Sequence, residues 1–337
     1  MRILHVLPYD LRQPGGVQTH TLALSRALNE LGHESRIFAP SRPFRVAMGG
    51  TRADIALHPL DLLELRKALR NPHDVLHIQE PMLPLLGPLS LLHPGPASTV
   101  VTLHSAETVA NRCYRWLDPL PRWLLSRADA WICASDVAKQ IAAPAIGDAA
   151  QVIYPCLELD SFRAVRRDPE PEAILFVGRD EPRKGLAVLL EAIELLPSAR
   201  LIVAGPVSDE TRRAAGSRTT LLGPVPHEQV PDLLSTAACA AFPAIGGEAL
   251  GLVLVEAMAA GVPVAASDID GYRIAADGGR AALLSRPGDA LAFAENLARL
   301  LGDHHLRSRL SDAGRAAAER FDARLIAEQH LALYRSL

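Results

Sequence analysis

The sequence predicts an α/β protein with two similar domains, each a doubly wound parallel sheet with helices on both faces. The chain has 337 residues, about twice the roughly 150 residues of a common domain. Short apolar and β-branched runs alternate with longer helical patterns from end to end, and this alternation is typical of parallel sheets. The expected strands fall into two sets of six. We therefore expect the second half to repeat the plan of the first.

The expected strands of the first half are Ile3–Leu7, Arg36–Ala39, Val75–Ile78, Thr99–Leu103, Ala130–Ala134 and Val152–Tyr154. Those of the second half are Ile174–Val177, Leu201–Ala204, Thr220–Leu222, Ala240–Phe242, Val262–Ala266 and Ala282–Leu284.

A polar stretch, Pro155–Pro171, separates the two sets of strands. Its Asp-Pro and Glu-Pro steps suit a linker. We place the boundary near Phe162, so that residues 1–162 form the first domain and residues 163–320 the second. The last segment, Phe321–Leu337, has apolar residues at roughly helical spacing and is expected to form a packed terminal helix.

Composition excludes several classes of protein. Hydrophobic residues make up 49% of the chain and charged residues 22%, which argues against disorder and coiled coils. The 35 Lys and Arg residues against 38 Asp and Glu give a net charge of -3, so the chain lacks a global basic field for nucleic acid. The 4 cysteines form no CxxC pair, so we expect them to be reduced and mostly buried.

The sequence also argues against secretion and membrane spanning. The N-terminal apolar run is interrupted by His5 and Pro8 and is too short for the core of a signal peptide. The longest apolar stretch, Ala249–Ala266, contains Glu256 and Pro263, which suits a buried helix followed by a strand better than a membrane span. We therefore expect a cytoplasmic protein.

The first candidate site is the pair Gly15 and Gly16, which follows the first expected strand and opens a helix that runs to about Leu31. Two glycines allow the backbone to approach a ligand, and a helix N-terminus favours an anion. A tight strand-to-helix turn explains the pair equally well. The chain has no GxGxxG fingerprint of dinucleotide binding.

The second candidate is the segment Gly178–Gly185, directly after the first strand of the second half. It contains Arg179, Arg183 and Lys184. Cations at the carboxyl end of a strand can neutralise a diphosphate, with arginine binding as a fork and lysine as a point charge. A solvated, charge-balanced turn is the alternative.

The third candidate is a pair of glutamates in the segment Gly246–Pro263. Glu248 lies in a glycine-rich loop, and Glu256 lies inside an otherwise apolar helix. A buried carboxylate is costly unless it accepts hydrogen bonds, and sugar or ribose hydroxyls are suitable donors. The alternative is that Glu248 caps a helix and Glu256 extends to solvent.

The fourth candidate is His104, which ends a strand and is followed by Ser105. Ligands of open α/β sheets bind at such strand ends, although a single histidine is more often packed or exposed. The chain has no GxSxG, HExxH, GxxxxGK[ST] or DxDxDG pattern. Serine hydrolases, zinc proteases, P-loop NTPases and calcium sensors are therefore disfavoured.

With these four segments in this order, the chain resembles the retaining GT-B glycosyltransferases of family 4 over nearly its whole length. The run GGE-x7-E-AMAAG-x-P is the most specific element, and GR-x-EPRKG and GGVQ-x-H support it. Within that family the chain is most similar to the phosphatidyl-myo-inositol mannosyltransferases, which share HI-x-EP at His77–Pro81. The resemblance implies two Rossmann-like domains that face an interdomain cleft, with the terminal helix 321–337 crossing back to the first domain.

The resemblance also implies a sugar-nucleotide site, carried mainly by the second domain. Arg179 and Lys184 would hold the diphosphate, together with the backbone of Gly16. Glu256 would bind the ribose and Glu248 the transferred sugar. The remaining residues assigned to this site by their place in the glutamate motif are Gly251 and Leu252. No metal and no tightly bound cofactor are implied.

The first domain would hold the acceptor. His104 would contact the transferred sugar near its anomeric centre, so the resemblance implies that it acts with Arg179, Lys184 and Glu248 in catalysis. The acceptor-side positions are Tyr9, Gln18 and Ser105. The position of a family lysine that helps hold the acceptor phosphate is Val109 here.

We interpret the chain as a retaining hexosyltransferase that acts on a lipid-linked or glycan acceptor, such as phosphatidylinositol. Mannose from GDP-mannose is the favoured donor. One alternative is a UDP-sugar-dependent family 4 hexosyltransferase in glycolipid or polysaccharide synthesis, and another is a non-catalytic sugar-nucleotide-binding protein. Such a protein would be expected to lose some of the charged residues that are intact here.

The segment Leu60–Arg70 raises the question of membrane contact. Leu62, Leu65 and Leu69 lie on one helical face, with basic side chains elsewhere, as in helices that lie on anionic lipid. A helix packed on the sheet in the ordinary way explains the pattern equally well. Peripheral contact with the inner membrane surface is therefore one of two interpretations.

Overall fold

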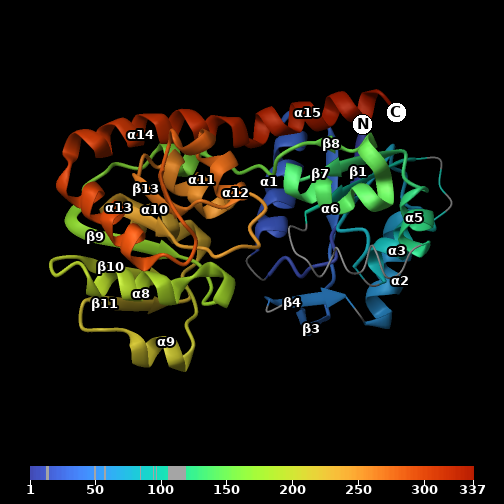
Figure 1. Cartoon of the computed structure of the whole chain (residues 1–337). Coiled ribbons are helices and arrows are strands. Elements are labelled where there is room, and N and C mark those ends of the chain that lie inside the picture. Colours follow the sequence, from blue (N-terminus) through green and yellow to red (C-terminus); the bar gives the residue numbers. More distant parts are fainter. Residues whose placement is uncertain are drawn as a thin grey trace. The chain divides into compact units, whose positions relative to one another are not determined.

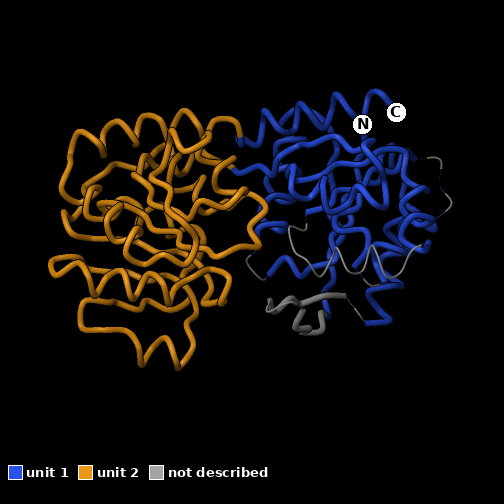
Figure 2. Tube along the Cα trace, viewed as in Figure 1, with its two compact units in different colours: residues 1–157, 321–337 blue, residues 158–320 orange. Residues whose placement is uncertain are grey.

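The computed structural model describes residues 1–12, 15–48, 51–56, 58–83, 85–93, 95, 97–104 and 119–337. The chain forms two compact units, which Figure 2 shows in blue and orange. Unit 1 comprises Met1–Leu157 and Phe321–Leu337, and unit 2 comprises Glu158–Arg320. Each unit contains a parallel sheet of 6 strands. The predicted fold class is therefore confirmed.

The sheet of unit 1 has the order β2-β1-β5-β6-β7-β8. Its strands are β1 (Arg2–Val6), β2 (Glu34–Phe38), β5 (Val75–Gln79), β6 (Ser98–Leu103), β7 (Ala130–Cys133) and β8 (Gln151–Val152). All six expected strands of the first half are present. Two further strands, β3 (Pro43–Met48) and β4 (Thr51–Ala56), pair antiparallel in a separate sheet that the sequence analysis did not predict.

Side chains alternate between the two faces of this sheet, and each face has its own helices. Ile3 belongs to the core beneath α1 (Gly16–Glu30) and α15 (Ala323–Arg335). Leu4 and Val6 belong to the opposite core. That core contains residues of α2 (Pro59–Arg70), α3 (Leu86–Leu91), α5 (Leu120–Leu125) and α6 (Asp136–Ile146).

The last helix, α15, packs on unit 1 beside α1 (Figure 1). Ile326, Leu331 and Tyr334 are buried, as the helical spacing of apolar residues requires, whereas Leu325 is exposed. The helix begins at Asp322, whose carboxylate accepts the backbone N–H of Arg324. Such a cap satisfies an N–H group that has no partner within the helix.

Unit 2 has a sheet of the order β11-β10-β9-β12-β13-β14. Its strands are β9 (Glu170–Val177), β10 (Arg200–Ala204), β11 (Thr219–Gly223), β12 (Ala237–Phe242), β13 (Val264–Ser267) and β14 (Leu283–Ser285). The main helices are α8 (Leu186–Glu194), α9 (Asp209–Ala214), α10 (Val230–Thr236), α11 (Leu252–Ala259), α12 (Asp270–Ala275), α13 (Ala290–Gly302) and α14 (His304–Ala318). All six expected strands of this half are present as well.

Unit 1 ends at Leu157, before the boundary expected near Phe162. The short helix α7 (Asp160–Arg163) belongs to unit 2, where Phe162 is buried with its ring 5.8 Å from that of His227. Arg163 also forms an ion pair of 2.6 Å with Glu319. These contacts join α7 to unit 2.

Three of the cysteines, Cys133, Cys156 and Cys239, are buried, as expected, and Cys113 lies outside the described residues. Every helix in the described part of the chain is too short or too polar to cross a lipid bilayer.

Candidate functional site

In unit 2 the chain order of the strands reverses between β9 and β12, which are neighbours in the sheet. Ligands of open α/β sheets bind beyond the carboxyl ends of the strands at such a reversal. The two strands lead directly into the segments Gly178–Gly185 and Gly246–Gly251. The topology therefore brings the second and third candidate segments to one edge of the sheet.

Close backbone contact joins these two segments. Ile245 donates its N–H to the carbonyl of Arg183 at 2.8 Å. Gly185 adopts a φ of 70°, and a Cβ at this position would lie 2.0 Å from the carbonyl oxygen of Pro243. Both the positive φ and the lack of space require glycine. The GR-x-EPRKG segment is thus held against the loop that follows β12.

Three cations and two carboxylates form a cluster at this edge. Lys184 Nζ lies 2.6 Å from Glu248 Oε1, and Arg183 donates to the same carboxylate. Glu181 lies 2.8 Å from the Arg183 guanidinium and 3.1 Å from that of Arg179. The carboxylates are nearly buried, whereas the Arg179 side chain is 39% exposed. The ion pairs with Glu248 join the side chains of the two segments.

Glu248 does not cap the helix α11, which follows its loop. The N-cap residue of α11 is Gly251, which has a φ of 83° and lies so close to Tyr272 that a Cβ would be 2.3 Å from its ring. Leu252 is the first residue of the helix and is partly buried. Burial raises the pKa of Tyr272 well above its usual value, so its hydroxyl stays neutral.

Glu256 is 5% exposed inside α11 and does not extend to solvent. Its Oε1 lies 2.9 Å from Nε2 of His227. The hydrogen bond and charge of Glu256 raise the pKa of His227 above its usual value. The buried carboxylate thus has a half-exposed partner in His227.

The His227–Glu256 pair predicts a specific pH dependence of stability. Because the folded pKa of His227 is raised, its stabilising contribution is present below the unfolded pKa of about 6.5 and is lost as pH rises through the folded value. We expect His227→Gln to lower the free energy of unfolding by about 0.5–1 kcal/mol at pH 6, and less at pH 9. Denaturant titrations at both pH values measure the difference, and equal losses would contradict the ion pair.

In unit 1 the reversal of chain order lies between β1 and β5. The carboxyl end of β5 leads to Gln79 and Glu80, and that of the adjacent β6 leads to His104. His104 Nε2 lies 2.6 Å from Gln79 Oε1, and the His104 backbone N–H donates to Glu80 Oε1 at 3.0 Å. Burial lowers the pKa of His104 to about 3, so the imidazole is neutral at physiological pH.

The other candidates of unit 1 follow β1. Gly16 is the exposed first residue of α1, after the N-cap Gly15. Gln18 Nε2 donates to the carbonyl of Asp10 at 3.5 Å, next to the partly buried Tyr9. The Arg12 guanidinium lowers the pKa of the Asp10 carboxyl, which it contacts at 2.8 Å. The remaining candidates, Ser105 and Val109, lie outside the described residues.

The structure adds residues to which the sequence analysis gave no role. They are Gln79, Glu80, Glu181 and His227, which contact His104, Arg179 or Glu256 directly. Gln79 and Glu80 lie in the HI-x-EP motif and Glu181 lies in GR-x-EPRKG, so the motifs contained these residues but did not show their contacts.

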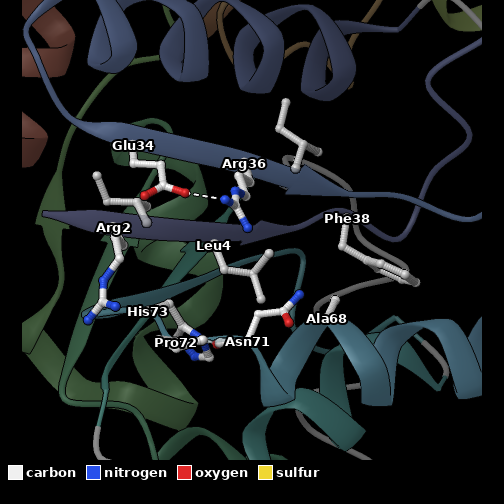
Figure 3. Close-up of a pocket in the computed structure, with 11 residues that line it drawn as sticks. Arg2, Leu4, Glu34, Arg36, Phe38, Ala68, Asn71, Pro72 and His73 are labelled. Carbon is white, nitrogen blue, oxygen red and sulfur yellow. Dashed lines mark hydrogen bonds and ion pairs between the residues drawn. The ribbon is translucent and has the colours of Figure 1, made fainter.

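A separate hollow of about 140 Å³ lies between β1, β2 and the end of α2 (Figure 3). Its wall includes Arg2, Phe38 and the ion-paired Glu34 and Arg36. None of the candidate residues lines it. We therefore assign no substrate to this hollow.

Family comparison covers the chain in two parts. Residues 14–161 match Glycosyltransferase Family 4, and residues 159–317 match Glycosyl transferases group 1. The phosphatidyl-myo-inositol mannosyltransferase of Mycobacterium tuberculosis is 33% identical over 373 residues, covering 100% of this chain and 97% of that protein. The enzyme of the same name from Propionibacterium freudenreichii is 31% identical and covers 99% and 94%.

Solved structures share the fold at lower identity. Sucrose-phosphate synthase from Thermosynechococcus elongatus has a TM-score of 0.77 at 21% identity, covering 100% of this chain and 99% of that one. HepE of Anabaena in complex with UDP-glucose has a TM-score of 0.76 at 18% identity, covering 100% of both chains. With whole-length relatives above 30% identity, the chain belongs to the GT-B glycosyltransferases of family 4, and it is related to phosphatidyl-myo-inositol mannosyltransferases.

Proposed function

We propose that the chain transfers a hexose with retention from a sugar nucleotide to a lipid-linked or glycan acceptor. GDP-mannose is the favoured donor, and phosphatidylinositol is the favoured acceptor. The cluster of Arg179, Arg183 and Lys184 with Glu181 and Glu248 carries the proposal. The whole-length relatives, which are named phosphatidyl-myo-inositol mannosyltransferases, support the choice of sugar and acceptor.

The cluster matches the charge that develops during glycosyl transfer. As the bond between the anomeric carbon and the diphosphate breaks, negative charge grows on the leaving group and positive charge on the sugar. Arg179 and Lys184, now paired with Glu181 and Glu248, would turn to the diphosphate and bind it more strongly as it leaves. Glu248 would then accept hydroxyl groups of the sugar. These cations supply the charge for which other enzymes use a metal ion, so we propose transfer without one.

Retention would follow from attack on the face that the leaving group occupies. The acceptor hydroxyl oxygen forms the new bond to the anomeric carbon, and its proton passes to an oxygen of the departing phosphate. His104, Tyr9, Gln18 and Ser105 would contact the sugar and acceptor. A neutral His104 imidazole suits this place, because it does not repel the positive charge that develops on the sugar.

A panel of ligands tests the donor assignment. We expect GDP and GDP-mannose to raise the midpoint of thermal unfolding more than UDP, ADP or their sugar conjugates, because a ligand that binds only the folded state stabilises it by about 2.7 kcal/mol at 100 times its Kd. A preference for UDP would support the UDP-sugar alternative. No response to any nucleotide would contradict the transferase assignment.

We also propose that unit 1 contacts an anionic membrane, on the cytoplasmic side. The face of α2 formed by Leu65 and Leu69 packs on the sheet and is not available for lipid. Other apolar side chains of α2, of α3 beside it with its C-cap, and of α5 beside α3 are exposed, namely Leu60, Leu63, Leu89, Leu92, Leu120 and Trp123. The exposed basic side chains on these helices are Arg66, Lys67, Arg70 and Arg122. Apolar and basic side chains together suit a bilayer surface that carries negative charge.

Vesicle flotation measures this contact. We expect Leu63→Gln with Trp123→Gln to reduce binding to vesicles of phosphatidylinositol and phosphatidylcholine by about tenfold or more, since each buried apolar side chain contributes about 1.5–3 kcal/mol. Leu222→Gln with Leu291→Gln removes exposed leucines from unit 2 and serves as the matched control. Equal binding of all variants would exclude this surface.

A further inference from the structure

Unit 1 contains a cluster of buried histidines, drawn from both the sheet and the helices that cover it. Their imidazoles come from β1, α1, β5, the end of β6 and α15, and each residue is 8% exposed or less. Neighbouring ring centroids lie 5.1–6.1 Å apart. The cluster consists of His5, His20, His77, His104 and His330. No group of His, Cys, Asp and Glu among the described residues could hold a metal ion, so the cluster needs another explanation.

A path of hydrogen bonds crosses this cluster from α15 to His104. Tyr334 Oη lies 2.7 Å from His77 Nδ1. His77 Nε2 lies 2.6 Å from Thr102 Oγ1 and 3.3 Å from Gln79 Nε2. Gln79 Oε1 in turn lies 2.6 Å from His104 Nε2. Each of these polar side chains is fully or almost fully buried, so water does not compete for the same bonds.

The orientation of the Gln79 amide assigns the protons along this path. Its Nε2 can only donate, so His77 Nε2 accepts and the His77 proton lies on Nδ1, where it donates to Tyr334 Oη. Its Oε1 can only accept, so His104 carries its proton on Nε2. His104 Nδ1 is then unprotonated and can act as an acceptor.

The backbone around His104 is held by the neighbour of Gln79. Glu80 accepts the His104 N–H through Oε1 at 3.0 Å and donates its own N–H to the carbonyl of Thr102 at 2.8 Å. Glu80 has a φ of 48°, a conformation that a residue with a side chain rarely adopts and that costs about 1–3 kcal/mol. Strain of this kind persists where the surrounding structure requires it. Here the side chain of Gln79 contacts the ring of His104, and the side chain of Glu80 contacts its backbone N–H.

We propose that Gln79 is a positioning residue, which fixes the ring orientation and the tautomer of His104, and that His77 and Tyr334 hold Gln79 in turn. His104 then presents Nδ1 as an acceptor for a hydroxyl of the transferred sugar. The contact with sugar rests on the proposed function, whereas the tautomer does not. The proposal gives the C-terminal helix a direct part in the geometry of the site.

The tautomer of His104 is measurable in the full-length protein by long-range 1H–15N correlation of histidine side chains. In the wild type we expect His104 to be protonated on Nε2. Gln79→Leu removes the acceptor, so we expect a mixture of tautomers and a kcat at least tenfold lower, with the KM of the donor changed less. Gln79→Glu keeps an acceptor for Nε2–H, so we expect the wild-type tautomer and, because a carboxylate favours the imidazolium, a higher pKa of His104.

Tyr334→Phe tests the far end of the path with the loss of one hydroxyl. We expect a shift of the His104 tautomer in the direction of Gln79→Leu and a smaller loss of kcat. Tyr154→Phe removes a hydroxyl of unit 1 that bonds Asp136 instead, and it should change neither. An unchanged tautomer in both Gln79→Leu and Tyr334→Phe would overturn the proposal, as would losses of kcat with the wild-type tautomer intact. The predicted tautomer shifts in a protein that transfers no sugar would support positioning and contradict the proposed function.

Discussion

Lys184→Ala and Arg179→Ala each lower kcat/KM by about 10²–10³-fold, the loss expected when one group that stabilises developing charge is removed. Most of the effect falls on kcat, because the cations bind the diphosphate most strongly as it leaves. Lys184→Arg keeps the charge and recovers part of the activity, although its fork cannot reproduce a point charge at the same place. Steady-state kinetics with the donor identified by the nucleotide panel measures these effects.

The matched control is Arg273→Ala, which removes a half-exposed arginine of α12 that pairs with Asp268 and Asp270. It lies in the same unit and takes no part in the proposed site, so kcat/KM should stay within about twofold of the wild type. Wild-type turnover in Lys184→Ala or Arg179→Ala would refute the role in phosphate binding. A loss that appears only in the KM of the donor would show that the cations bind substrate and transition state equally.

The pairing inside this cluster could not be predicted from the sequence. Strand ends place GR-x-EPRKG and the glutamate motif at one edge, and the sequence analysis used that rule correctly. The sharing of Glu181 between Arg179 and Arg183, however, depends on the turn of residues 182–184 and on the hydrogen bond from Ile245 to Arg183. Such contacts join segments far apart in the chain and leave no periodic signal.

The contact between Gln79 and His104 was missed for a similar reason. The register of β5 and β6 places Gln79 opposite Thr102, so that the side chains at the ends of the two strands meet. A single sequence shows where each strand lies but does not show its register with a neighbour. The tyrosine that completes the path comes from α15, and the spacing of apolar residues in that helix predicts its buried face without its partners.

The fold could be predicted more fully from the sequence than the contacts of the site, because an apolar run of strand length occurs at every strand of the two parallel sheets. The antiparallel pair β3 and β4 was overlooked, although its sequence contains a hairpin signal. Phe44, Val46 and Met48 alternate with other residues, and Gly-Gly follows directly. Elsewhere strands alternate with helices, which predicts parallel strands joined by helical crossovers. An antiparallel hairpin such as β3 and β4 departs from that pattern.

The buried histidine cluster predicts that unit 1 unfolds steeply in mild acid. Burial lowers the pKa of His5 and His104 to about 3 and that of His330 to about 4, and it lowers those of His20 and His77 well below the usual value. The unfolded chain binds these protons near pH 6.5. The free energy of unfolding is therefore at its full value above that pH. It falls as pH drops toward the folded pKa values, by up to about 1.4 kcal/mol per pH unit for each group.

Five such groups give a slope of up to about 7 kcal/mol per pH unit, which would exhaust a typical stability of about 5–15 kcal/mol within one to two units. We expect a cooperative transition between about pH 4.5 and 5.5. Trp123 and Trp131 lie in the described part of unit 1, whereas Trp116 lies outside the described residues. The fluorescence of Trp123 and Trp131 therefore follows this unit. Tyr334 contacts two of the imidazoles. Its hydroxyl is neutral throughout this range, because its ordinary pKa of about 10 lies far above it and burial raises the pKa further.

His5→Leu provides the decisive comparison. Neither ring nitrogen of His5 has a hydrogen-bond partner among the described residues, so an apolar side chain of similar size removes a costly polar group without breaking a bond seen there. We expect this variant to move the acid midpoint to lower pH and to reduce proton uptake on unfolding by about one. A transition that takes up fewer than two protons in the wild type, or an unchanged uptake in His5→Leu, would show that the buried imidazoles do not control the acid stability of unit 1. If the uptake falls as expected, burial beneath α1 and α15 keeps the imidazoles of the cluster neutral and lowers the free energy of unfolding in acid. The same burial keeps the imidazole of His104 uncharged.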